Sequence, residues 1–230
     1  MTEFQHSVDG ANASLYGCSQ DVGMHDDSEK DEFNSIYPTE AEVNYIREEA
    51  DRGDIGETYL DAETLEMLEK AENRAATTGR VLVITNISKI CNIIQLLLLA
   101  KAHDFVPVVV ASTKTLTSEL SKLHAPFFRI ATIMQLRDWL QKHEIPLLGI
   151  EIMDTAISVD KNPFYARMAF MPGNEGTGLS DAQKQACQGY VIIPHYGTAT
   201  ASLNVHIASC VVLYRYSTWA KERGISLGPS

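Results

Sequence analysis

Residues 172–180 read PGNEGTGLS, and residues 192–209 read IIPHYGTATASLNVHIAS. These segments form two glycine-rich turns, and the second runs directly into an apolar helix. Because small residues let the backbone approach a ligand closely, the pair predicts a narrow pocket. The glycines expected to shape it are Gly173, Gly176, Gly178 and Gly197. The polar side chains expected in it are those of Glu175, Ser202 and Asn204.

Strands and helices alternate from Arg80 onward, which predicts an α/β fold with a largely parallel sheet. Short apolar runs rich in β-branched residues are typical of buried parallel strands. The expected strands cover residues 81–85, 106–112, 146–152, 166–171 and 190–194. The expected helices cover residues 90–103, 115–122, 132–143, 181–188 and 202–222. Because the last helix is apolar on nearly every face, we expect another surface, such as a second subunit, to cover it.

Most of the acidic residues lie in the N-terminal part of the chain. Residues 1–70 carry 19 Asp and Glu against 4 Lys and Arg, a net charge of -15, whereas residues 71–230 carry 11 against 15, a net charge of +4. A mildly basic body is compatible with an RNA partner, because phosphate contacts need local clusters of positive charge. We therefore divide the chain into four parts. These are a disordered acidic segment at 1–38, an acidic helical extension at 39–78, a body at 79–224 and a tail at 225–230. Two helices are expected in the extension, the first from Thr39 and the second from Asp61. They either dock on the body, engage a partner or belong to a solvated acidic segment.

Several classes of protein are disfavoured by the composition. The four cysteines are widely separated, with no CxxC pair and no histidine at metal-ligand spacing, so we expect neither a disulfide framework nor a metal site. The opening MTEFQHSVDG lacks the apolar core of a secretory signal. The longest apolar run, residues 93–100, is too short to span a bilayer. The sequence thus predicts an intracellular protein of the cytoplasm or nucleus, with the mitochondrion left open and no membrane contact.

The two glycine-rich segments contain the strings G-x-E-x-x-G-L-S and I-P-x-x-G, followed by S-L-N-V. These strings resemble motifs of the SpoU/TrmH-type RNA ribose 2′-O-methyltransferases, a branch of the knotted SPOUT superfamily. The resemblance covers roughly residues 80–222 and implies a parallel-sheet α/β sandwich with a deep C-terminal trefoil knot. It also implies S-adenosyl-L-methionine as cofactor, tRNA or rRNA as substrate, and a homodimer packed through the 202–222 helix, or a heterodimer with an active relative.

The resemblance carries site residues over position by position. The positions implied for cofactor binding are Met171, Gly173, Gly178, Ile193, Pro194, Gly197, Ser202 and Leu203. The positions implied for catalysis are Asn92, Glu175, Ser202 and Asn204. Read without the family, Ser202 also fits a helix N-cap and Glu175 a turn anchor.

One position departs from the family pattern. The first motif spans residues 81–105 and contains Asn86 and Asn92, but Leu98 occupies the position of the family's Arg. Leucine cannot hold a charge or accept a proton, so two hypotheses remain open. One is an active methyltransferase, and the other is a catalytically impaired RNA-binding or assembly subunit. The candidates to replace the Arg are Lys89, Lys101, His103, Arg129, His195 and His206.

Overall fold

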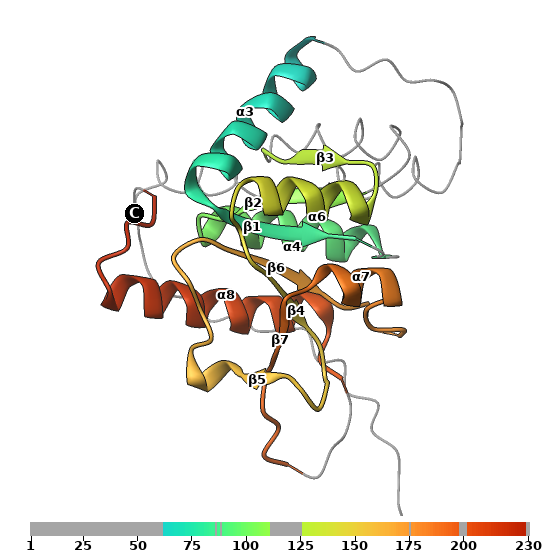
Figure 1. Cartoon of the computed structure of the whole chain (residues 1–230), viewed down its shortest axis with the longest axis vertical. Coiled ribbons are helices and arrows are strands. Elements are labelled where there is room, and N and C mark those ends of the chain that lie inside the picture. Colours follow the sequence, from blue (N-terminus) through green and yellow to red (C-terminus); the bar gives the residue numbers. More distant parts are fainter. Residues whose placement is uncertain are drawn as a thin grey trace, which may run out of the picture. The chain divides into compact units, whose positions relative to one another are not determined.

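The computed structural model describes residues 62–85, 87, 89–110, 126–174, 176–197 and 202–228 (Figure 1). The described residues contain helices and strands in alternation. In chain order these are α3 (Ala62–Thr78), β1 (Arg80–Ile84), α4 (Ile90–Ala102), β2 (Val106–Val110), β3 (Phe128–Ile130), α6 (Ile133–Lys142), β4 (Leu147–Ile150), β5 (Ile157–Ser158), a 3-10 turn η1 (Val159–Lys161), β6 (Met168–Pro172), α7 (Asp181–Ala186), β7 (Gly189–Ile192) and α8 (Val205–Glu222).

The strands form one seven-stranded sheet in the order β3-β2-β1-β6-β4-β7-β5. Every pairing in it is parallel. The chain lays down β1, β2 and β3 toward one edge and then returns, so that β6 lies between β1 and β4. Ligands in open parallel sheets bind beyond the carboxyl ends of the strands, at the point where the strand order reverses. In this sheet the order reverses around β1, β6 and β4, so a ligand is expected near the carboxyl ends of these strands.

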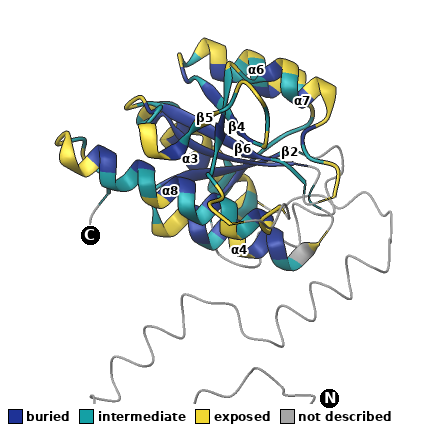
Figure 2. Ribbon diagram, turned by 90° about the horizontal axis from the view of Figure 1, so that it is seen from below, coloured by how far each residue is buried: buried dark blue, intermediate teal, exposed yellow. Residues whose placement is uncertain are grey.

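Helices cover both faces of the sheet, as Figure 2 shows with the buried strands between them. Successive strand residues point to opposite faces. In β1, Leu82 and Ile84 pack in a core with α4 and α8, whereas Val81 and Val83 pack in a second core with α3, α6 and α7. Each face of the sheet is therefore apolar, which explains why the strands read as continuous apolar runs.

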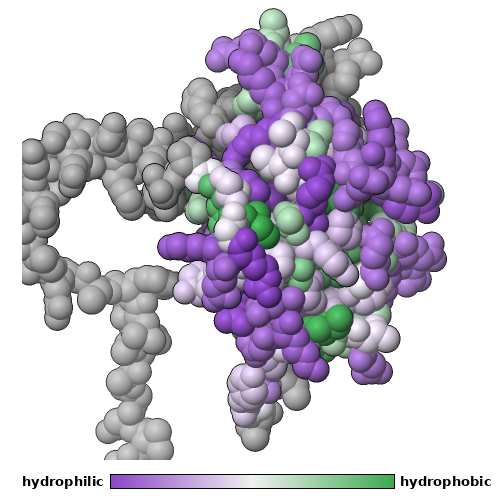
Figure 3. Space-filling view, turned by 60° about the vertical axis from the view of Figure 1, so that its left-hand side comes forward, coloured by the Kyte–Doolittle hydropathy of each residue, from purple (hydrophilic) through white to green (hydrophobic). Residues whose placement is uncertain are grey.

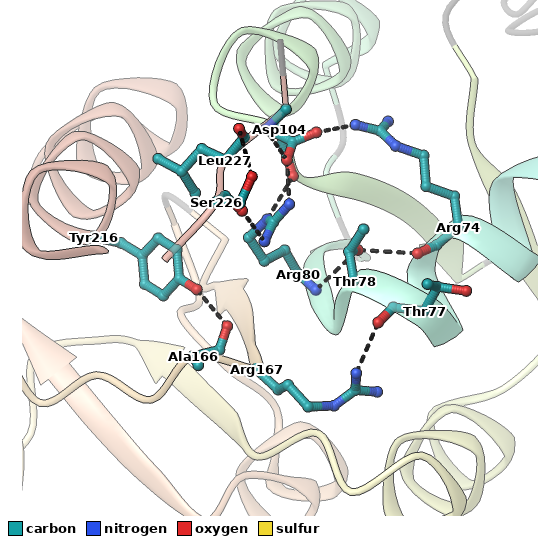
Figure 4. A network of polar contacts seen from close by, with 11 residues as sticks. Arg74, Thr77, Thr78, Arg80, Asp104, Ala166, Arg167, Tyr216, Ser226 and Leu227 are labelled. Carbon is teal, nitrogen blue, oxygen red and sulfur yellow. Dashed lines mark hydrogen bonds and ion pairs between the residues drawn. The ribbon is translucent and has the colours of Figure 1, made fainter. Parts of the chain in front are cut away.

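Polar contacts join α3 and the C-terminal segment to the sheet (Figure 4). The carboxylate of Asp104 accepts hydrogen bonds from the guanidinium groups of Arg74 and Arg80 and, at 2.7 Å, from the backbone N–H of Gly228. Arg80 is almost fully buried, and it also donates to the backbone carbonyl of Ser226 at 3.2 Å. A buried guanidinium needs such partners because its desolvation is costly. The network thus fixes both ends of the described chain to β1.

Apolar surface is limited where the C-terminal segment lies. Figure 3 shows this side of the molecule, where hydrophilic side chains cover most of the surface and apolar patches are small and separate. The face shown is therefore mainly polar.

The predicted α/β fold with a parallel sheet is confirmed. The helix expected at the end of the acidic extension is α3, and it docks on the body, since Ala71 and Ala75 are buried in the core. The two shortest strands, β3 and β5, were not predicted, because two or three residues carry too little periodicity to be recognised. The disordered segment, the first extension helix and the 115–122 helix lie outside the described residues.

Threading of the chain through its own loop also stays a prediction. The relevant path passes through residues 198–201, which lie outside the described part of the chain.

Candidate functional site

Three neighbouring strands end at the same edge of the sheet, and a residue of the site follows each of them directly. Glu151 follows β4, Gly173 follows β6, and Ile193 follows β7. Because β4 pairs with both β6 and β7, these residues are brought together although they are far apart in the sequence. This edge is where a ligand site is expected in an open parallel sheet.

A pocket of about 530 Å³, including its open mouth, lies at this edge. Most of its wall is aliphatic, and a few polar groups converge on it. The lining residues are Ile150, Glu151, Ile152, Pro172, Gly173, Asn174, Val191, Ile192, Ile193, His195, Ser202, Leu203, Val205 and Ala208.

A second, more polar cavity of about 680 Å³ adjoins the first. Four residues line both cavities, namely Glu151, Ile152, Asn174 and Ser202. The second cavity adds the glycine-rich turn at 176–178 and the ammonium-bearing Lys184. A cation on its wall suits an anionic ligand such as a phosphate.

The glycine-rich turn is held by a carboxylate. Glu151 Oε2 accepts from the backbone N–H of Leu179 at 2.8 Å, and Oε1 accepts from the N–H of Ile152 at 2.9 Å. A Cβ on Gly173 would lie 2.4 Å from Oε2, and one on Gly178 would lie 2.5 Å from it. Gly178 also has a φ of +64°, which side chains rarely adopt. Both glycines are thus required by the position of this carboxylate.

Helix α8 begins one residue after Asn204. The side-chain oxygen of Asn204 accepts from the N–H groups of His206 at 2.9 Å and Ile207 at 3.4 Å, which satisfies two free donors of the first turn. The alternative that made Ser202 the cap is therefore wrong, and the helix starts at Val205 rather than at Ser202. Ser202 does not cap the helix, and it lines both cavities.

Asn92 and Asn204, both predicted to be catalytic, lie within hydrogen-bonding distance of each other in the folded chain. Asn204 Nδ2 donates to Asn92 Oδ1 at 3.5 Å, and Asn92 is buried at the start of α4. Neither belongs to the lining of the two cavities, although Val205, next to Asn204, lines the first one. The structure thus brings the first and third motifs together beside the pocket.

The predicted cofactor-binding residues divide into two groups. Gly173, Ile193, Ser202 and Leu203 line the first pocket, and Gly178 and Ser202 line the second. The others do not line either pocket. Met171 is fully buried in the core with α6, Pro194 is half-buried, and Gly197 is exposed, with open space where a Cβ would lie. Glu175 and Asn86 lie outside the described residues.

Sequence reasoning missed Glu151, which was included in the predicted strand at 146–152. The signal was a charged residue at the carboxyl end of an otherwise apolar run. Asn174 was also missed, and its side chain accepts from the N–H groups of Gly176 at 2.9 Å and Thr177 at 3.2 Å. These contacts depend on tertiary placement and local turn geometry, so periodicity does not reveal them.

Among the residues considered as substitutes for the missing Arg, His195 lines the first pocket. His206 lies in the first turn of α8, where burial lowers the pKa of its imidazole. His103 lies at the far end of α4, and its Nδ1 is 2.9 Å from Ser217 Oγ. Leu98 is half-buried on α4. Of these residues, His195 is the one that a ligand in the pocket would meet.

The described part of the chain contains neither a membrane-spanning helix nor a metal-binding cluster. No helix there is long and apolar enough to cross a membrane. No cluster of three or more His, Cys, Asp or Glu there could hold a metal ion.

Known proteins with similar sequences are RNA methyltransferases by name. The 23S rRNA (guanosine-2′-O-)-methyltransferase RlmB of Coxiella burnetii is 30% identical over 89 residues, which are 39% of this chain and 35% of that protein. A putative TrmH family tRNA/rRNA methyltransferase of Staphylococcus haemolyticus is 30% identical over 91 residues, or 40% of this chain and 36% of that protein. The match thus spans about a third of the length of each curated relative.

Solved structures share the fold at low sequence identity. The SpoU methyltransferase AviRb of Streptomyces viridochromogenes, in complex with AdoMet, has a TM-score of 0.53 and 22% identity over 62% of this chain and 60% of that one. The TrmH/SpoU tRNA modifying enzyme of A. aeolicus has a TM-score of 0.53 and 16% identity over 73% of this chain and 90% of that one. The sequence profile of the SpoU rRNA Methylase family matches residues 79–214, which is more than half of the chain. The chain therefore belongs to the SpoU rRNA Methylase family.

Proposed function

We propose that this protein is an S-adenosylmethionine-dependent RNA ribose 2′-O-methyltransferase acting on tRNA or rRNA. The observation that carries the proposal is the pocket at the ends of β4, β6 and β7, lined by Gly173, Ile193 and Leu203. These are motif residues of the family, and they converge on one cavity. The name of the Coxiella burnetii relative, a guanosine-2′-O-methyltransferase, supports the ribose hydroxyl as target.

The lining of the pocket suits S-adenosylmethionine. Ile150, Val191, Ile193 and Leu203 offer an apolar wall against which a purine packs. Close approach of backbone is possible at Gly173, where a side chain would collide with its surroundings. When bound, the cofactor supplies a methyl group on a positively charged sulfur. The residues of this chain would hold the adenosine half and orient the sulfur toward the incoming hydroxyl.

The reaction requires a group that takes the hydroxyl proton. Transfer forms a bond between the ribose oxygen and the methyl carbon, breaks the bond between that carbon and sulfur, and releases one proton. Leu98 cannot receive that proton. His195 lines the pocket, and histidine is the side chain that most often serves as a general base in enzymes. We assign His195 as the first candidate for this role.

The second candidate function is a catalytically impaired RNA-binding or assembly subunit. The observation that favours it is Leu98, a half-buried aliphatic residue where the family has a charged one. Such a subunit would retain the pocket and bind cofactor without turning it over. It would act beside an active relative in a heterodimer.

Helix α8 is the proposed dimer contact. Its inner face packs on the sheet, but Ile207 and Tyr214 are 48% and 61% exposed. Leu203, just before the helix, is 36% exposed and also lines the pocket. A second subunit covering these side chains would remove apolar surface from water and border the ligand site. The same surface serves a homodimer or a heterodimer.

The test is methyl transfer by the purified full-length protein. The protein is incubated with S-adenosylmethionine labelled in its methyl group and with total cellular RNA. The RNA is then digested to nucleosides, and mass spectrometry determines which position carries the label. Label on a 2′-O-methyl nucleoside is expected, and chemically matched RNA lacking the 2′-hydroxyl should remain unlabelled. Label on a base would contradict ribose specificity. Cofactor binding without transfer to any RNA would favour the assembly subunit.

A further inference from the structure

Glu151 occupies a distinctive place in the site. It is the first residue after β4, between the ends of β6 and β7, and it lines both cavities. No salt bridge joins it to a cation among the described residues. Because Glu151 lines both cavities, its carboxylate is within reach of a ligand in either of them.

The orientation of the carboxylate is fixed. Backbone N–H groups donate to each oxygen, from Leu179 to Oε2 at 2.8 Å and from Ile152 to Oε1 at 2.9 Å. Gly173 and Gly178 lie close against this carboxylate, since a Cβ at either position would lie within 2.5 Å of Oε2. A carboxylate of fixed orientation thus lies at this point, and no cation among the described residues pairs with it.

Two of its acceptor positions remain unused. An ionised carboxylate has about four lone-pair sites, and the two backbone donors take two of them. The free sites need donors from a ligand, and the wall beside Glu151 is aliphatic, from Ile150 and Ile152. A ligand with an apolar ring and adjacent hydroxyl donors fits this combination. Acidic residues that follow a parallel strand in dinucleotide-binding sheets hydrogen-bond a ribose hydroxyl in the same way.

We infer that Glu151 binds the ribose hydroxyls of the adenosine half of the ligand in the first pocket. The inference rests on the proposed function, because it takes the pocket to be the nucleoside site of the methyl donor. Glu151 then does two things at once. It holds the glycine-rich turn through Leu179, and it recognises the sugar through its free lone pairs.

The experiment compares two ligands on one protein by calorimetry. S-adenosylhomocysteine carries both ribose hydroxyls, and its 2′,3′-dideoxy analogue carries neither. Wild-type full-length protein is expected to bind the hydroxylated ligand about 10- to 100-fold more tightly, as hydrogen bonds to a charged acceptor imply. Glu151→Gln should reduce this ratio to below about threefold. The control Glu222→Gln, at an exposed position at the end of α8, should keep the wild-type ratio.

The outcomes separate the inference from the function on which it rests. If Glu151→Gln weakens both ligands equally and keeps their ratio, the residue only holds the turn, and the inference is overturned. Equal affinities of the wild type for both ligands would also overturn it while leaving cofactor binding in place. If the wild type binds neither ligand, the proposed function fails as well. Because the ratio is measured on one preparation, partial unfolding of a variant does not change it.

Discussion

Gly173→Ala is expected to destabilise the site because there is no space for one added carbon. A Cβ at Gly173 would lie 2.4 Å from Glu151 Oε2 and 3.2 Å from the backbone carbon and Cα of Gly178. Real Cβ atoms essentially never approach another atom to 2.4 Å. Since Oε2 belongs to a side chain and the other two atoms belong to the backbone, the carboxylate is the group that must move.

The cost follows from the bond that this movement breaks. Oε2 accepts from the N–H of Leu179 at 2.8 Å, and a hydrogen bond to a charged group contributes about 1.5–3 kcal/mol. For a domain of roughly 150–250 residues, each kcal/mol lowers the midpoint of thermal unfolding by about 2–4 °C. We therefore expect Gly173→Ala to lower that midpoint by about 3–12 °C.

The assay is thermal unfolding by circular dichroism, with binding of S-adenosylhomocysteine by calorimetry on the same samples. Gly176→Ala is a matched control in the same turn, because its Cβ would lie 3.6 Å from Asn174 Oδ1, an ordinary contact. This control should stay within about 0.5 kcal/mol of the wild type. If Gly173→Ala unfolds and binds like Gly176→Ala, the tight packing of Glu151 against Gly173 is refuted.

Three further changes test other parts of the molecule. Leu98→Arg should raise methyl transfer by about 10²- to 10⁴-fold at unchanged cofactor affinity, because it restores a charged group of the first motif, and an unchanged rate would show that Leu98 is not the defect. Asp104→Asn should lower the free energy of unfolding by about 1.5–3 kcal/mol in denaturant titrations, because the buried Arg80 loses its anionic partner. The exposed Asp138→Asn should cost at most about 1 kcal/mol, and equal losses would contradict the role of burial. Burial lowers the pKa of His103, so the folded state disfavours its charged form and stability should fall as pH drops below about 6.5. His103→Gln should flatten that dependence, and an identical slope in the variant would assign it to other groups.

Local sequence patterns correctly predicted several helices and strands of this protein and the position of its pocket. The 132–143 helix was predicted from the sequence, and the structure shows α6 there, with the side chain of Thr132 accepting from the N–H of Gln135. The β-branched runs at 81–85 and 106–112 likewise predicted buried parallel strands. The glycine-rich strings marked the pocket, because Gly173 directly follows a strand and a parallel sheet collects such positions at one edge.

The same local reasoning left some positions undecided. It allowed Ser202 as a helix cap, whereas the structure shows that Asn204 accepts from two N–H groups of the first turn. It also did not decide whether the acidic extension docks on the body. In the structure, residues 62–78 of the extension dock, because Ala71 and Ala75 are buried in the core. Short-range sequence patterns do not determine whether such a segment docks, because docking depends on the surface that the segment meets after folding.

The sequence by itself determined the longer strands and helices of the described body, the uneven charge of an acidic front and a mildly basic body, and the family to which the chain belongs. Only the tertiary structure decided that β6 lies between β1 and β4, and therefore that Glu151 stands between Gly173 and Gly178. The physical reason is the range of the forces involved. Backbone propensity and capping act over a few residues. Strand order and the fit of a carboxylate between two glycines depend on contacts between segments more than twenty residues apart, which exist only in the folded chain.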